Sequence, residues 1–225
     1  MLAALIFDVD GTLAETEEAH RRAFNDSFAA AGLGWHWSQV TYRRLLTITG
    51  GKERMRAHAG ETGTRLDDRR IAALHAEKTA RYGRIIAEGG VPLRPGVAAL
   101  IAAARAAGLR LAVATTTSRP NVEVLARAAF GCAAGEVFDV IAAGDEVPAK
   151  KPAPDVYRLA LARLDLPPAS CLAFEDSRNG MLAARAAGLR VVVTPSIYTA
   201  GEDFTGATEL LADLSGFRLD MPQDG

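Results

Sequence analysis

Residues 2–12 read LAALIFDVDGT, a short apolar run that ends in two acids and a glycine. A run of this length before a turn signal is typical of a buried strand in a parallel sheet. Because side chains alternate along a strand, we expect the carboxyl groups of Asp8 and Asp10 on one side, close together. Gly11 allows a sharp bend directly after them. A capped turn is the plainer alternative, since Asp and Gly are common in turns.

Four further apolar runs alternate with helical stretches over the second half of the chain. We expect strands at residues 110–115, 138–143, 170–174 and 190–194, and helices at residues 95–107, 120–130, 154–164 and 177–187. Pro near the helix starts and Gly just past their ends support these limits. This alternation predicts an α/β fold, a doubly wound parallel sheet, in which chemistry collects at the carboxyl ends of the strands.

Residues 15–91 interrupt this alternation. Their amphipathic or polar segments are residues 17–31, 38–46, 51–59 and 67–88, and such segments predict helices. We therefore expect a core domain formed by residues 1–14 and 92–225, and an inserted α-helical cap domain formed by residues 15–91, with a hinge at residues 89–92. Trp35 and Trp37 are expected in the apolar centre of the cap.

The composition excludes several classes of protein. The 225 residues are 49% hydrophobic and 24% charged, with a formal net charge of −1. No global positive field favours nucleic acid or an anionic membrane. The opening apolar run is too short for a membrane span and lacks the features of a signal peptide. Cys132 and Cys171 form neither a disulfide framework nor a zinc motif. We expect a cytoplasmic monomer without nucleic-acid or membrane partners.

Polar side chains stand at the ends of the other expected strands. Thr115 and Thr116 end the second, where a hydroxyl can donate to a phosphate oxygen. Lys151 follows the third, and an ammonium there would neutralise a nucleophile and a phosphoryl group. Glu175 and Asp176 end the fourth and offer the hard oxygen ligands that Mg²⁺ prefers. Each alone has a plainer explanation, as a turn threonine, a surface lysine or a helix cap.

Taken together and in this order, these elements resemble the haloacid dehalogenase-like phosphohydrolases over nearly the whole chain. The resemblance implies that Asp8 is the nucleophile and Asp10 the general acid and base, while Thr115 and Lys151 hold the phosphoryl group. The implied Mg²⁺ ligands are the Asp8 carboxylate, the Asp10 backbone carbonyl and Asp176, with Glu175 assisting. Because Asp10 supplies a second acid, dehalogenation is disfavoured.

Three segments are similar to the CbbY branch of that family: FDVDGTLAETEE at residues 7–18, TGGKER at 49–54 and ATTTS at 114–118. That branch is linked to Calvin-cycle operons, and its implied reaction removes the 1-phosphate of xylulose-1,5-bisphosphate, an inhibitory by-product of Rubisco. Two glycines followed by two cations suit a second phosphate at a helix start, although a solvated helix start would look the same. The candidate substrate-binding residues are Glu17, His20, Gly50, Gly51, Lys52, Arg54, His75, Lys78, Thr116, Ser118 and Asn121.

Other functions remain open on the sequence alone. A β-phosphoglucomutase would share the cap, His20 and the four motifs. A phosphoglycolate phosphatase is a weaker alternative, because a monophosphate leaves Lys52 and Arg54 little to bind. A non-catalytic binding protein on the same fold is disfavoured by the presence of all four motifs together. Arg119 and Arg178 match no role in the resemblance.

Overall fold

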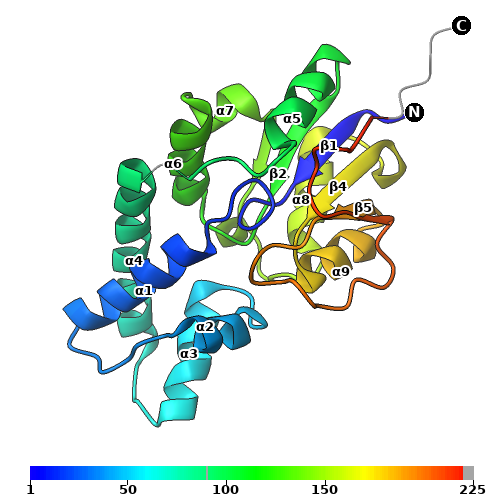
Figure 1. Ribbon diagram of the computed structural model, residues 1–225. Coiled ribbons are helices and arrows are strands. Elements are labelled where there is room, and N and C mark those ends of the chain that lie inside the picture. The colour runs from blue at the N-terminus through cyan, green and yellow to red at the C-terminus, as the bar shows by residue number, and fades with distance from the viewer. Residues whose placement is uncertain (90, 220–225) are drawn as a thin grey trace, which may run out of the picture.

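The structure is a computed structural model that describes residues 1–89 and 91–219 (Figure 1). Gly90 of the expected hinge and residues 220–225 of the expected core lie outside the described residues. The strands are β1 (Ala4–Phe7), β2 (Arg110–Ala114), β3 (Val140–Ala142), β4 (Cys171–Glu175), β5 (Arg190–Val193) and β6 (Glu209–Leu210). They form one parallel sheet in the order β3-β2-β1-β4-β5-β6. The predicted doubly wound α/β fold is confirmed, and β6 is an exposed strand that the sequence did not predict.

Helices cover both faces of the sheet because successive strand residues point to opposite sides. Leu5 and Phe7 pack in one apolar cluster with α5 (Val97–Ala106) and α6 (Arg119–Phe130). Ala4 and Ile6 pack in another with α8 (Asp155–Leu164) and α9 (Arg178–Ala186). All four helices were predicted. The short elements α7 (Ala134–Val137), η1 (Gly144–Glu146) and η2 (Pro168–Ser170) were not.

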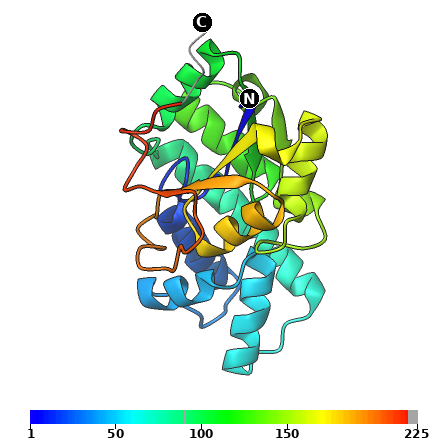
Figure 2. The same cartoon turned by 90° about the vertical axis from the view of Figure 1, so that its right-hand side faces the viewer.

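Four helices separate β1 from α5, namely α1 (Glu17–Ala30), α2 (Gln39–Leu46), α3 (Gly51–Thr62) and α4 (Asp68–Gly89). Figures 1 and 2 show them gathered at one end of the sheet. Phe24, Phe28 and Trp37 are buried in an apolar cluster of their own, with Trp35 packed against it. No helix within residues 1–89 and 91–219 is long and apolar enough to cross a bilayer.

The strand order places one crevice at the centre of the sheet. β1 lies between β2 and β4, and Phe7 pairs with both Val113 and Phe174. The chain adds β2 and β3 on one side of β1 and then crosses to add β4 and β5 on the other, and such a switch point opens a crevice at the carboxyl ends of the strands. Asp8 is the first residue beyond β1 and lies at this crevice.

Candidate active site

Asp8 is held by a buried lysine. The Lys151 ammonium donates to Asp8 Oδ1 at 2.7 Å, to Glu175 Oε1 at 2.5 Å and to the Ala114 carbonyl at 2.9 Å. These bonds use all three protons of the ammonium. The Tyr157 hydroxyl also donates to Glu175 Oε1, at 2.5 Å. Lys151 is therefore fixed between the ends of β1, β2 and β4.

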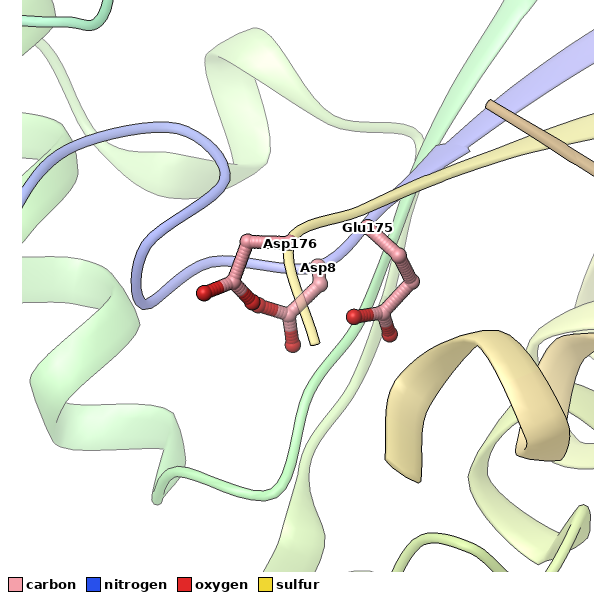
Figure 3. A group of neighbouring side chains, drawn as sticks. All are labelled: Asp8, Glu175 and Asp176. Carbon is pink, nitrogen blue, oxygen red and sulfur yellow. The ribbon is translucent and has the colours of Figure 1, made fainter. Parts of the chain in front are cut away.

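Asp8, Glu175 and Asp176 bring three buried carboxyl groups together (Figure 3), with oxygen atoms within 4.8 Å of one another. Burial and the charge of Glu175 raise the pKa of Asp8 to about 8, although Lys151 opposes the shift. Burial, Asp8 and Glu175 raise the pKa of Asp176 well above its usual value. A divalent cation would relieve this repulsion, and carboxylate oxygens are the ligands that Mg²⁺ prefers. The donor set fits a Mg²⁺ site.

The Asp10 carboxylate has different partners. The Thr16 hydroxyl donates to Asp10 Oδ1 at 2.5 Å, and His20 Nε2 lies 3.0 Å from the same oxygen. Lys78 Nζ lies 2.7 Å from His20 Nδ1. Because an ammonium only donates, Nδ1 accepts and Nε2 carries the proton that is shared with Asp10. Burial opposes ionisation of Asp10, but His20, Thr16 and Lys78 outweigh it and lower its pKa to about 2.

Asp8 and Asp10 line the same cavity, but strand alternation is not the reason. β1 ends at Phe7, so neither acid belongs to the strand. Gly11 turns the chain instead, with φ at +85°, a conformation that side chains rarely adopt. A Cβ at Gly11 would overlap the Asp176 carboxylate. Glycine is therefore needed for the turn and for the close approach of the two acidic loops.

A cavity of about 320 Å³ lies at this crevice. The expected site residues that line it from residues 15–91 are Glu17, His20, Gly50, Gly51, Lys52, Arg54, His75 and Lys78. Those that line it from the rest of the chain are Asp8, Asp10, Thr116, Ser118, Asn121, Lys151 and Asp176. Thr115 and Glu175 are buried behind the lining. Thr115 Oγ1 accepts a bond from the Thr117 amide at 3.2 Å.

Tyr42 lines the cavity as well, one of two interpretations that the sequence left open for it. The lining residues that the sequence analysis missed are Phe24, Leu46, Thr49, Glu53, Thr117, Asp145, Lys150, Ser177, Asn179, Thr199 and Glu202. Thr117, Lys150 and Ser177 adjoin motif residues, so their position in the sequence was a usable signal. Thr199 and Glu202 lie in the loop after β5, where no motif marks them. With Lys150 included, all four lysines of the chain line this cavity, which suits a ligand with several negative charges.

Arg54 and Lys52 differ in how many hydrogen bonds they make within the protein and in how exposed they are. Arg54 is buried and donates to the Leu45 carbonyl and the Tyr42 hydroxyl, both at 3.2 Å. Tyr42 donates in turn to Glu17 Oε2 at 2.6 Å. Lys52 is exposed at the cavity. The geometry makes Arg54 part of the cavity wall and leaves Lys52 the more available to a ligand.

Two smaller features shape the wall of the cavity. Burial and the charges of Lys78 and Lys52 lower the pKa of His75 to about 3, so its ring is neutral. A Cβ at Gly51 would come within 2.8 Å of the His75 ring nitrogen Nε2, so glycine makes room for the ring. Ser118 Oγ is buried and finds no hydrogen-bond partner among the described residues. A ligand oxygen would satisfy it.

Comparisons with known proteins agree with this site. The model of the haloacid dehalogenase-like hydrolase family matches residues 2–188. The chain belongs to this family. It is 64% identical over 214 residues to protein CbbY of Rhodobacter capsulatus, covering 95% of this chain and 94% of that protein. The crystal structure of CbbY from Rhodobacter sphaeroides in complex with phosphate matches with a TM-score of 0.93 and 56% identity over 96% of each chain.

The same TM-score, identity and coverage hold for a D10N mutant of the Rhodobacter sphaeroides protein in complex with xylulose-1,5-bisphosphate. The expected membership of the CbbY branch is thus confirmed. The expectation of an enzyme is confirmed as well, and the chain is a phosphatase. A non-catalytic binding protein on this fold is set aside.

Proposed function

We propose that this phosphatase uses Mg²⁺ and an aspartyl-phosphate on Asp8 to convert xylulose-1,5-bisphosphate into xylulose 5-phosphate. The observation that carries the proposal is the Asp8 carboxylate, 2.7 Å from the Lys151 ammonium in a cavity that all four lysines line. The mutant neighbour in complex with this bisphosphate, at 56% identity, supports the choice of substrate.

In the first step, an Asp8 oxygen bonds to phosphorus while the bond from phosphorus to the sugar oxygen breaks. The Lys151 ammonium, already bonded to Asp8, offsets the negative charge that gathers there. Asp8, Glu175, Asp176 and the Asp10 carbonyl would hold Mg²⁺, which would supply further positive charge to the phosphoryl oxygens. Thr116 and Ser118 line the cavity, and Thr115 is buried next to Thr116. We assign Thr115 to holding the phosphoryl group, and Thr116 and Ser118 to binding the substrate.

Asp10 handles the proton in both steps. Its pKa of about 2 keeps it ionised in the free protein, but the charges of a bound phosphate raise the pKa of a neighbouring acid. A protonated Asp10 then gives its proton to the departing sugar oxygen. The resulting carboxylate takes a proton from water as that water attacks the phosphorus, which releases phosphate and restores Asp8.

We assign residues 1–14 and 92–225 to the catalytic core and residues 15–91 to a cap that closes over it. The support is that both segments line the cavity. Asn179 Nδ2 donates to Thr49 Oγ1 at 3.1 Å, and Arg43 Nη2 donates to the Ile197 carbonyl at 3.0 Å, so bonds join the two segments. Closure of this kind limits the access of water and completes the substrate site.

The test is phosphate release from a panel of sugar mono- and bisphosphates, with Mg²⁺ and with EDTA. We expect kcat/KM for xylulose-1,5-bisphosphate to exceed that for monophosphates by at least about 100-fold, and EDTA to abolish turnover until Mg²⁺ is restored. Mass spectrometry of the acid-quenched protein should find phosphate on the peptide that contains Asp8. Glucose 6-phosphate formed from β-glucose 1-phosphate, or equal turnover of phosphoglycolate, would overturn the proposed substrate.

Substitution of Lys52 tests whether this residue binds the second phosphate of the substrate. In Lys52→Met we expect KM for the bisphosphate to rise about tenfold, the worth of one charged contact, with kcat changed less than about twofold. KM for a monophosphate should stay the same, because a monophosphate has no second phosphate for Lys52 to bind. Lys52→Arg keeps the charge and is the matched control. A parallel rise in KM for both substrates would contradict the assignment.

The lowered pKa of Lys78 predicts that activity falls at alkaline pH. Burial lowers the pKa of its ammonium to about 8, with Asp10 and Glu17 opposing. As pH rises through about 8 the cavity loses a positive charge, so kcat/KM at saturating Mg²⁺ should fall severalfold between about pH 7 and 9. In Lys78→Arg the charge persists and the fall should move to higher pH. An unchanged alkaline limb in Lys78→Arg would rule Lys78 out as its cause.

A further inference from the structure

Arg94 lies outside the cavity lining but bonds to two loops next to the site, the one that follows Asp10 and the one that follows β5. Its guanidinium Nη1 donates to the carbonyl of Gly11 and, at 2.7 Å, to that of Thr194, while Nη2 donates to the Pro195 carbonyl at 2.8 Å. Nε lies 3.3 Å from a carboxylate oxygen of Glu15. The side chain is 9% exposed. Three backbone carbonyls, one near the start of the chain and two adjacent ones after β5, thus accept bonds from one cation.

The first of these carbonyls belongs to the loop that carries Asp10. Gly11 directly follows Asp10, and its Cα lies so close to Asp176 that a Cβ would overlap that carboxylate. The other two carbonyls precede Ser196, which packs 3.1 Å from the same Cβ position. Thr199, bonded to the Ser196 amide at 2.8 Å, donates to the Asp176 carbonyl at 2.6 Å. Arg94 therefore joins the Asp10 loop to the loop that supports Asp176.

Arg94 also stands where the chain returns from the cap. Its amide donates to the Leu13 carbonyl at 2.8 Å, and Leu93 pairs with Ala14 in an antiparallel bridge. Glu15, which faces the guanidinium, is the first residue of the cap segment. The planar guanidinium offers five donors in a fixed fork, whereas an ammonium offers three around one point. With three protons, lysine at position 94 could not serve all three carbonyls and Glu15 together.

We propose that Arg94 is a positioning residue that sets the separation of Asp10 and Asp176 and links both to the cap junction. The inference rests on the proposed phosphoryl transfer at Asp8 but needs no particular sugar substrate. A displacement of about 1 Å of a reacting group costs on the order of 100-fold in rate. Loss of the fork should accordingly lower kcat, while the cap residues that bind substrate keep KM nearly constant.

The experiment compares Arg94→Lys and Arg94→Met with wild type, using p-nitrophenyl phosphate and the best sugar phosphate. We expect kcat to fall about 10- to 100-fold with KM within about threefold, and the Mg²⁺ concentration for half-activation to rise. The increase of the thermal midpoint on adding Mg²⁺ should shrink in both variants, a readout that survives even if the proposed reaction is wrong. Arg94→Lys carries the test if Arg94→Met fails to fold.

Arg110→Lys is the matched control, because Arg110 donates to a backbone carbonyl, that of Leu164, at 2.5 Å at the start of β2, away from the site. It should keep wild-type kcat and the wild-type response to Mg²⁺. The proposal is overturned if Arg94→Lys keeps kcat within about twofold of wild type and loses only thermal stability, or if it raises KM alone.

Discussion

Asp8→Asn is expected to lower turnover by at least about 10⁴-fold, the scale seen when a covalent nucleophile is removed. An amide does not attack phosphorus to form an acyl-phosphate, and the remaining groups can only bind the substrate. Substrate binding should persist, because Lys52, Lys78 and Lys151 all remain at the cavity. The measurement is phosphate release, with the intact mass confirming that the introduced amide has not been hydrolysed back to a carboxylate.

The same substitution should leave the metal-free protein more stable. Burial raises the pKa of Asp8 from 3.8 to about 8. A raised pKa means that the Asp8 contribution to stability is complete below pH 3.8 and is lost as pH rises through about 8. The introduced amide has no charge to bury, so the thermal midpoint of the variant in EDTA should overtake that of wild type by more at pH 8 than at pH 5.

Asp139→Asn provides the control for Asp8→Asn. Asp139 precedes β3 at the opposite ends of the strands and accepts a bond from the Leu111 amide at 2.8 Å. An Asn side chain can still accept that bond, so activity and its response to Mg²⁺ should match wild type. Turnover by Asp8→Asn close to the wild-type rate would remove the covalent mechanism.

The sequence predicted the sheet because its strands are buried on both faces and so read as continuous apolar runs. It missed β6 because Glu209 and Leu210 are exposed and paired through one edge only. The motif residues that line the cavity could be predicted from their positions directly after strands, because the carboxyl ends of parallel strands lie at one edge of the sheet. Propensity and periodicity contain no information about which of Thr115 and Thr116 faces the cavity.

The contacts that cross the fold were beyond reach of the sequence. Arg94 reads as an ordinary residue before Pro95, and its partners at Gly11 and Thr194 become neighbours only when β1 and β5 enter one sheet. The alternation argument for Asp8 and Asp10 gave the wrong reason, because it requires β1 to continue through Asp10 and β1 ends three residues earlier, at Phe7. The local sequence pattern predicts which edge of the sheet holds the active site, whereas tertiary packing determines which atoms each side chain contacts.

Lys151→Met is expected to damage both activity and stability. Burial disfavours the ammonium, but Asp8 and Glu175 outweigh it and raise the pKa of Lys151, so the lysine is charged throughout the physiological range. Its removal takes the bonded cation from between two buried carboxyl groups, which costs about 3–5 kcal/mol in comparable cases. Turnover should fall by about 10²- to 10³-fold, the loss that follows removal of one preorganised donor.

The pH dependence of the Lys151→Met variant separates these effects. Lys151 lowers the pKa of Asp8 in wild type, so its loss drives that pKa above about 8. The penalty for ionising Asp8 in the folded state then grows further as pH rises, and the difference in unfolding free energy between variant and wild type, measured in EDTA, should be larger at pH 8 than at pH 5. Added Mg²⁺ should recover part of the stability, because it can neutralise the same carboxyl groups.

Two comparison variants make the Lys151 result decisive. Arg163→Met breaks an ion pair with Glu146 that is 2.7 Å long but partly exposed, with side chains 38% and 27% accessible. This pair and the bond from Arg163 Nη1 to the Ile141 carbonyl at 2.6 Å are together worth about 1–2 kcal/mol, so this variant should lose less stability than Lys151→Met and keep wild-type turnover. Lys151→Arg keeps the charge but spreads it over a plane, and should recover stability more than activity. If Lys151→Met lost no more stability than Arg163→Met, the ammonium would not be the group that makes ionised Asp8 tolerable in the folded protein.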